Sequence, residues 1–88
     1  MKKNFTLAQK HISLTTGDVI RMLRELKGWT QEKLAALSGV NAKNLSLLEN
    51  NKVDIGKKRA VQIANACGVH PSIIMFPEYE AELIHMVA

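Results

Sequence analysis

The 88-residue sequence has few of the features that stabilise small exported proteins or mark membrane segments. Its single cysteine, Cys67, excludes a disulfide bond within the chain and a zinc site built from several cysteines. No apolar run approaches the roughly 20 residues that span a bilayer, and the first residues lack the continuous apolar stretch of a signal peptide. We therefore expect a protein with no membrane contact that stays in the reducing cytoplasm.

The sequence also lacks the residue patterns of common enzymes and metal proteins. His11, His70 and His85 do not have the spacing of metal ligands, and no cluster of cysteines or carboxylates accompanies them. No strand-turn-helix nucleophile elbow is present, and Cys67 fits a buried structural thiol better than a nucleophile. A chain of this length holds one small domain. We expect no catalytic residues, no metal and no cofactor, and therefore no enzyme.

Charge is present but unevenly distributed. The net charge is +4, and all 12 lysines and arginines precede Pro77. The stretch after Pro77 contains three glutamates and no lysine or arginine. A basic body indicates a polyanionic partner, and an acidic end fits solvent or a protein surface.

The hydrophobic pattern divides the chain into three segments. Residues 1–14 alternate apolar and polar side chains, first around Phe5 and Leu7 and then around Ile12 and Leu14, which predicts a short β-prone N-terminal arm. A flexible arm is the alternative. Residues 15–76 follow the period of an α-helix and form the predicted domain, and residues 77–88 form a C-terminal amphipathic segment.

Five helices are expected in residues 15–76. Residues that favour helix ends separate them, and these are Thr15 or Thr16, Gly28, Thr30, Gly39, Asn41, Asn50-Asn51, Gly56, Gly68 and His70-Pro71. Apolar residues at helical spacing should face the core in the first four helices, namely Val19, Leu23 and Leu26; Leu34, Ala35 and Leu37; Leu45 and Leu48; and Ala60, Ile63, Ala64 and Cys67. Trp29 should pack between the first two helices.

Residues 30–50 are the most informative stretch. Two short capped helices are separated by a turn at Gly39, which is the pattern of a helix-turn-helix. On a helical wheel, Leu45 and Leu48 form one face of the helix that follows the turn, and the opposite side carries Ala42, Lys43, Ser46 and Leu47. Lysine can donate to guanine, serine to either type of base, and alanine or leucine can contact a thymine methyl group.

Several motifs in this chain resemble the Cro/CI-type, or XRE-type, helix-turn-helix domain of phage repressors and bacterial regulators. They are Gly28-Trp29-Thr30-Gln31, Leu34-Ala35, Gly39-Val40, Leu48-Glu49-Asn50 and Ile63-Ala64-Asn65-Ala66-Cys67-Gly68-Val69. The resemblance covers about residues 17–76. It implies an all-α, five-helix, lambda-repressor-like fold and a double-stranded DNA partner.

The resemblance also implies roles for individual residues. The positions that face base edges in the family correspond to Asn41, Ala42, Lys43, Ser46 and Leu47. Gln31 matches a glutamine that contacts a phosphate and braces the recognition helix, while Asn44 and Asn50 match residues that contact the DNA backbone. Arg24 and Glu49 match an ion pair that joins the first helix to the third. Ala42 and Leu47 depart from the glutamine-rich recognition helix common in the family.

The chain carries a basic cluster at the start of the fourth predicted helix. Lys57, Lys58 and Arg59 lie where the helix dipole disfavours positive charge, which suggests a duty other than helix stability. We expect Lys57 and Lys58 to contact DNA phosphates, with Lys52 beside them. A solvated surface cluster is the alternative.

The end of the chain is unusually apolar for a small domain. We expect Ile73, Ile74, Phe76, Tyr79 and Leu83 to form a homodimer interface. Completion of the chain's own core and a surface for a different protein are the alternatives.

Together these features predict a homodimeric, nucleoid-associated repressor that recognises an inverted-repeat operator through the helix at residues 41–50. The alternative is an antitoxin that binds and neutralises a toxin protein and also regulates its own operon. In that case the arm or the apolar C-terminus would hold the toxin.

Overall fold

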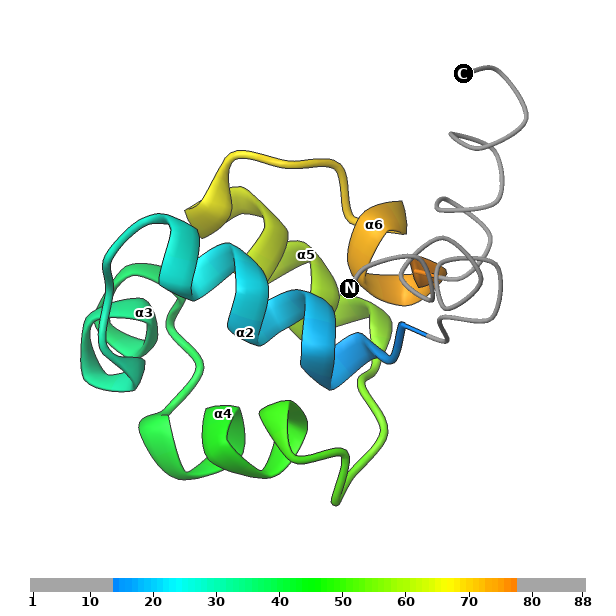
Figure 1. Cartoon of the computed structure of the whole chain (residues 1–88), viewed down its shortest axis with the longest axis horizontal. Coiled ribbons are helices and arrows are strands. Elements are labelled where there is room, and N and C mark those ends of the chain that lie inside the picture. Colours follow the sequence, from blue (N-terminus) through cyan, green and yellow to red (C-terminus); the bar gives the residue numbers. More distant parts are fainter. Residues whose placement is uncertain (1–13, 78–88) are drawn as a thin grey trace, which may run out of the picture.

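The computed structural model describes residues 14–77, and five α-helices make up this part of the chain. They are α2 (Thr16–Leu26), α3 (Gln31–Ser38), α4 (Ala42–Glu49), α5 (Lys57–Cys67) and α6 (Ser72–Met75). In Figure 1, α2 packs against α4, α5 and α6, and α5 also packs against α3 and α6. Residues 14–77 contain no strand, so the prediction of an all-α domain is confirmed.

Three helices begin at the capping residues that the sequence predicts. The side-chain oxygens of Thr15, Thr30 and Asn41 accept hydrogen bonds from the backbone N–H three residues later, at 3.0, 3.0 and 2.8 Å. Thr15 also donates its own N–H to Asp18 Oδ2 at 3.2 Å, which completes a capping box. Each cap satisfies an N–H that has no partner within its helix.

Every described helix contributes a fully buried aliphatic residue to one core. These side chains, each less than 2% exposed, are Ile20 from α2, Leu34 from α3, Leu45 and Leu48 from α4, Ile63 from α5 and Ile74 from α6. Burial of each such side chain is worth about 1.5–3 kcal/mol. Cys67 is buried with them as predicted, and burial raises the pKa of its thiol.

Two leucines that were expected to face the core are instead on the surface. Leu26 is 78% exposed and Leu37 is 48% exposed. In both helices the buried face is rotated from the expected stripe: it includes Ile20 in α2 and Ser38 in α3. At about 100° per residue, Leu26 and Leu37 then fall at the edges of these faces. Trp29 is partly buried against the core, as predicted.

The two terminal segments lie almost entirely outside the described residues. Of the predicted arm only Leu14 is described, and it packs against the core. The β-prone stretch before it and the amphipathic segment after Pro77 belong to residues 1–13 and 78–88. Within residues 14–77, every helix is too short or too polar to cross a membrane.

A close backbone contact joins the start of α2 to the end of α4. A Cβ atom added at Gly17 would lie 2.5 Å from the Glu49 carbonyl oxygen and 2.6 Å from that of Leu48. The Gly17 N–H donates to Asn51 Oδ1 at 3.1 Å, and Asn51 Nδ2 donates to Thr15 Oγ1 at 3.0 Å. Asn51 has a φ of 56°, the left-handed conformation expected where α4 ends.

We expect Gly17→Ser to destabilise the fold by about 1–3 kcal/mol, because the new side chain would meet two backbone carbonyls that cannot move independently. Gly56→Ser is the matched control. Its site has φ −91°, no atom within 4 Å of an added Cβ and a helix start without a side-chain cap, so serine should be neutral or stabilising there. Urea unfolding of both variants measures the difference. Equal losses would contradict the close approach at Gly17.

Candidate nucleic-acid interface

α3 and α4 form the helix-turn-helix, with a tight turn at Gly39. This glycine has a φ of 83°, a region that residues with a β-carbon rarely adopt, and its N–H donates to the Ala35 carbonyl at 2.9 Å. Within the turn, the buried Val40 N–H donates to Ser38 Oγ at 3.2 Å. Figure 1 shows α4 along one edge of the molecule, with the other helices on one side of it.

The outer side of α4 carries the residues that were predicted to face DNA bases. Asn41 and Lys43 are exposed, and Ala42, Ser46 and Leu47 are partly exposed. Leu45 and Leu48 are buried on the opposite side, so the two faces of the predicted helical wheel are confirmed. Asn41 uses its side-chain oxygen to cap α4, which leaves its NH₂ group as a hydrogen-bond donor for a further partner.

The C-terminal end of α4 is held by the buried carboxylate of Glu49. Its side chain is 0% exposed and receives two hydrogen bonds from Arg24, Nε to Oε2 at 2.7 Å and Nη2 to Oε1 at 3.0 Å. Gln31 Nε2 donates to Oε1 at 3.1 Å. Arg24 Nη1 also donates to the Trp29 carbonyl at 2.8 Å. The predicted ion pair is therefore present, and it joins α2, α3 and α4.

Two opposing effects set the pKa of Glu49. Burial alone would raise the pKa of this carboxyl, since the charged form loses its hydration. The hydrogen bonds from Arg24 and Gln31, together with the charges of Arg24 and Arg21, more than offset burial and hold the pKa of Glu49 below its ordinary value of 4.5. Its carboxylate is therefore ionised at neutral pH and fully partnered.

Arg21, on the side of α2 that faces α4, holds the C-terminal end of α4. Its Nη2 donates to the Glu49 carbonyl at 3.3 Å and to Asn50 Oδ1 at 3.1 Å, and its Nε lies 3.6 Å from Glu49 Oε1. Asn50 Nδ2 donates in turn to the Ser46 carbonyl at 2.8 Å. A cation at this position also compensates the negative end of the helix dipole.

A groove of about 520 Å³ runs between the N-terminal end of α4 and the start of α5. Polar and charged residues that line it are Asn41, Asn44, Asp54, Lys58, Arg59 and Gln62. The Asn44 amide is assigned with its oxygen toward Arg59, because in that orientation it accepts from Nη1 at 3.3 Å and from Nη2 at 3.1 Å. The structure thus brings the basic start of α5 beside the predicted recognition helix.

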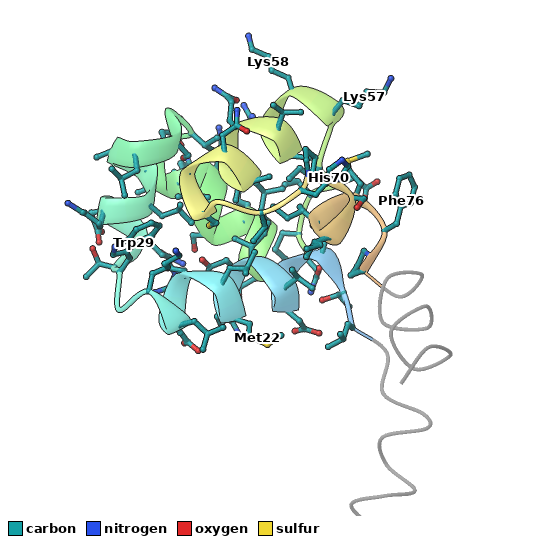
Figure 2. The ribbon with its side chains drawn as sticks, turned by 90° about the horizontal axis from the view of Figure 1, so that it is seen from above. Met22, Trp29, Lys57, Lys58, His70 and Phe76 are labelled. Atoms are coloured by element: carbon teal, nitrogen blue, oxygen red, sulfur yellow. The ribbon has the colours of Figure 1, made fainter. Side chains whose placement is uncertain are left out.

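The residues predicted to contact phosphates do not all have equally available side chains. Lys52, Lys57 and Lys58 are exposed, and Figure 2 shows Lys57 and Lys58 projecting from the start of α5. α5 begins at Gly56 without a side-chain cap. Gln31 and Asn50, by contrast, already hydrogen-bond within the chain, Gln31 in the bracing position that the family resemblance implies.

The predicted dimer interface divides into three parts. Ile74 is completely buried in the chain's own core, because α6 packs against α2 and α5 and its Ile74 carbonyl accepts from Thr16 Oγ1 at 2.9 Å. The alternative of core completion therefore holds for Ile74, which is unavailable to a second subunit. Phe76 is 58% exposed and Ile73 is partly buried. Tyr79 and Leu83 lie outside the described residues.

Sequence reasoning missed Arg21 and Asn51 as residues that position α4, and it missed the contact between Arg59 and Asn44. Arg21 lies three residues before Arg24, so its place on the same side of α2 was a usable signal. Gly17 was a second one, since a glycine in the first turns of a helix is unfavourable unless another segment approaches closely. The contact between Asn44 of α4 and Arg59 of α5 has no comparable signal in the sequence, because the two residues lie on separate helices.

Comparison with protein families matches residues 20–74 to the model described as Helix-turn-helix (HTH_3), which is of the XRE type. The match covers α3, the turn at Gly39, α4 and α5 completely. The chain belongs to this helix-turn-helix family. The predicted family resemblance and its lambda-repressor-like fold class are therefore confirmed.

A separate comparison with curated proteins finds relatives that are longer than this chain. An uncharacterized HTH-type transcriptional regulator of Mycobacterium bovis is 31% identical to this chain over 78 residues, and two proteins of the same description from Mycobacterium tuberculosis strains match equally. The aligned region covers 84% of this chain and 30% of each relative. The similarity therefore concerns less than a third of the length of these relatives.

We expect Arg24→Met to lower the free energy of unfolding by about 3–5 kcal/mol, because it leaves the buried Glu49 carboxylate without its main partner. The double variant Arg24→Met/Glu49→Met should lose less, since it removes both charges. Urea unfolding of the single and double variants measures this coupling. Strictly additive losses would contradict the role of Glu49 as a partnered buried charge.

The lowered pKa of Glu49 also predicts a pH dependence of stability. Because the folded-state pKa lies below 4.5, the stabilisation is complete above that pH and is lost as pH falls through the folded-state value. The difference in unfolding free energy between the wild type and Glu49→Gln should be constant from pH 7 to about 5 and shrink below. A difference that stays constant into the acid range would refute the assignment.

Proposed function

We propose that the chain binds double-stranded DNA sequence-specifically and regulates transcription, with α4 inserted in the major groove. The observation that carries this proposal is the accessible outer side of α4 beside a groove lined by Lys58 and Arg59, while the inner side is fixed by the buried Glu49. A rigid helix with one accessible polar side and adjacent cations fits recognition of base edges within a phosphate framework. The transcriptional-regulator names of the relatives favour the same function.

Base recognition is assigned to Asn41, Ala42, Lys43, Ser46 and Leu47. Lys43 is the strongest specificity candidate, since an exposed lysine can donate to guanine O6 and N7. Ala42 and Leu47 offer apolar contacts suited to the methyl group of thymine. The NH₂ group of Asn41 adds a donor at the first turn of the helix.

Phosphate contacts are assigned to Lys52, Lys57 and Lys58, with Gln31, Asn44 and Asn50 beside them. Three successive cations at the positive end of α5 repel the helix dipole and one another, and α5 has no side-chain cap to relieve this. A DNA phosphate would relieve it by bringing negative charge to the same place. Gln31 and Asn50 would mainly position α4, because their side chains already hydrogen-bond within the chain.

The chain acts in this proposal as a homodimeric repressor. The 58% exposure of Phe76 supports a further apolar contact at the end of α6, next to the segment with Tyr79 and Leu83. Two copies would place their recognition helices in successive major grooves about 34–36 Å apart, so the operator would be an inverted repeat. The antitoxin alternative depends on the terminal segments, and the geometry of residues 14–77 favours DNA recognition.

The decisive experiment is selection of binding sites from a randomised DNA library, followed by affinity measurements on the selected site and a scrambled duplex. The wild type should enrich an inverted repeat and bind it at least about 10³-fold more tightly than the scramble. Lys43→Ala should lower affinity for the selected site by about 5–150-fold and relax preference at one position of each half-site. Failure of the wild type to enrich any sequence would overturn the proposed function.

Lys58→Ala serves as the matched control, since it removes the same charge from the phosphate side of the interface. It should weaken binding to the selected and scrambled duplexes equally and reduce the slope of log affinity against log salt by about 1. If Lys43→Ala and Lys58→Ala changed both duplexes alike, the assignment of base and phosphate contacts would be wrong.

A further inference from the structure

The N-terminal half of α4 is linked to α5, a helix that is not part of the helix-turn-helix formed by α3 and α4. With the Asn44 amide assigned as described above, Arg59 Nη1 and Nη2 donate to its side-chain oxygen at 3.3 and 3.1 Å. Both residues line the groove of about 520 Å³ between the two helices. Within residues 14–77, no other hydrogen bond between side chains joins α4 to α5.

The consequence for Asn44 is a defined amide orientation. Its backbone N–H is already bonded to Asn41 Oδ1 at 2.8 Å, which fixes the first turn of α4. The side-chain oxygen accepts from two N–H groups of one planar guanidinium, so the NH₂ group must face away from Arg59. An amide that could otherwise offer either an acceptor or a donor therefore presents only a donor.

We propose that Arg59 is a positioning residue for DNA recognition, which sets the Asn44 side chain as a hydrogen-bond donor to the DNA beside the N-terminal end of α4. This inference rests on the proposed function. The acceptors are DNA phosphate oxygens, in line with the phosphate contact proposed for Asn44 above. Asn44 thereby meets the DNA backbone in an orientation set by Arg59, while Lys57 and Lys58 contact phosphates without such a partner.

The geometry of arginine is central to this role. A guanidinium presents its N–H groups in a rigid plane, and two of them reach the same amide oxygen. A lysine at residue 59 would keep the positive charge but would offer one flexible ammonium group. Arg59→Lys therefore separates the orienting role from a simple attraction to DNA.

The contact can be tested first in the free protein. The side-chain NH₂ signals of Asn44, assigned by their loss in Asn44→Ala, should shift in ¹⁵N NMR spectra of Arg59→Lys and Arg59→Ala. They should keep their positions in Lys58→Ala, which removes a neighbouring charge from the same groove. Unchanged Asn44 signals in both Arg59 variants would overturn the proposal.

The DNA test uses the site that the wild type selects from a randomised library and a scrambled duplex. Arg59→Lys should lower the affinities for both duplexes, each about 10-fold, with an unchanged salt slope because the positive charge is kept. Asn44→Ala should have a similar effect, and Arg59→Ala/Asn44→Ala should lose much less than the sum of the single variants on a logarithmic scale. Lys58→Ala should instead reduce the slope of log affinity against log salt by about 1.

The outcomes separate this inference from the function on which it rests. A wild-type chain that selects no site would contradict the proposed function, and the role of Arg59 in recognition with it. A wild-type chain that selects a site, together with an Arg59→Lys variant that keeps the wild-type affinity for both duplexes, would overturn the positioning role alone. Additive losses in the double variant would do the same.

Discussion

The arrangement of this helix-turn-helix domain depends on one buried ion pair, between Arg24 and Glu49. A carboxylate without solvent exposure is costly unless its oxygens are fully partnered, and here Arg24 and Gln31 supply those partners from α2 and α3. Since Glu49 is the last residue of α4, the pair fixes the orientation of this helix relative to α2 and α3. Apolar packing alone would hold α4 less specifically, because leucine contacts are non-directional.

α4 is held at both ends by polar contacts and along its middle by apolar ones. Arg21 and Asn51 secure the C-terminal end to α2, and Arg59 meets Asn44 near the N-terminal end from α5. Leu45 and Leu48 bury the inner side between these two ends. Rigid placement matters for this kind of surface, because hydrogen bonds to base edges are sensitive to displacements well below the diameter of an atom.

The local features of this fold could be predicted from the sequence, since caps, turns and helical periodicity are encoded by neighbouring residues. Thr15, Thr30 and Asn41 all cap the expected helices. The errors arose where the outcome depends on how helices rotate against one another, which a single helical wheel does not determine. Leu37 is exposed for that reason.

In the candidate site, too, local features could be predicted from the sequence and features that depend on helix packing could not. The accessible and buried sides of α4 follow from spacing, and the Arg24–Glu49 pair was implied by the family resemblance. The sequence left Ile74 open between a dimer interface and the chain's own core, because the outcome depends on where the short α6 docks. The contact of Arg59 with Asn44 likewise joins residues from separate helices and has no local sequence pattern.

The surroundings of Trp29 give this domain a built-in optical probe. Trp29 is the single tryptophan of the chain, its carbonyl accepts from Arg24 at 2.8 Å, and Lys27 Nζ lies 5.8 Å from the centre of its ring. Indole emission responds to nearby charge and hydration, so fluorescence of the unlabelled protein arises beside the ion pair that orients α4. Loosening at the junction of α2 and α3 would therefore change the emission spectrum.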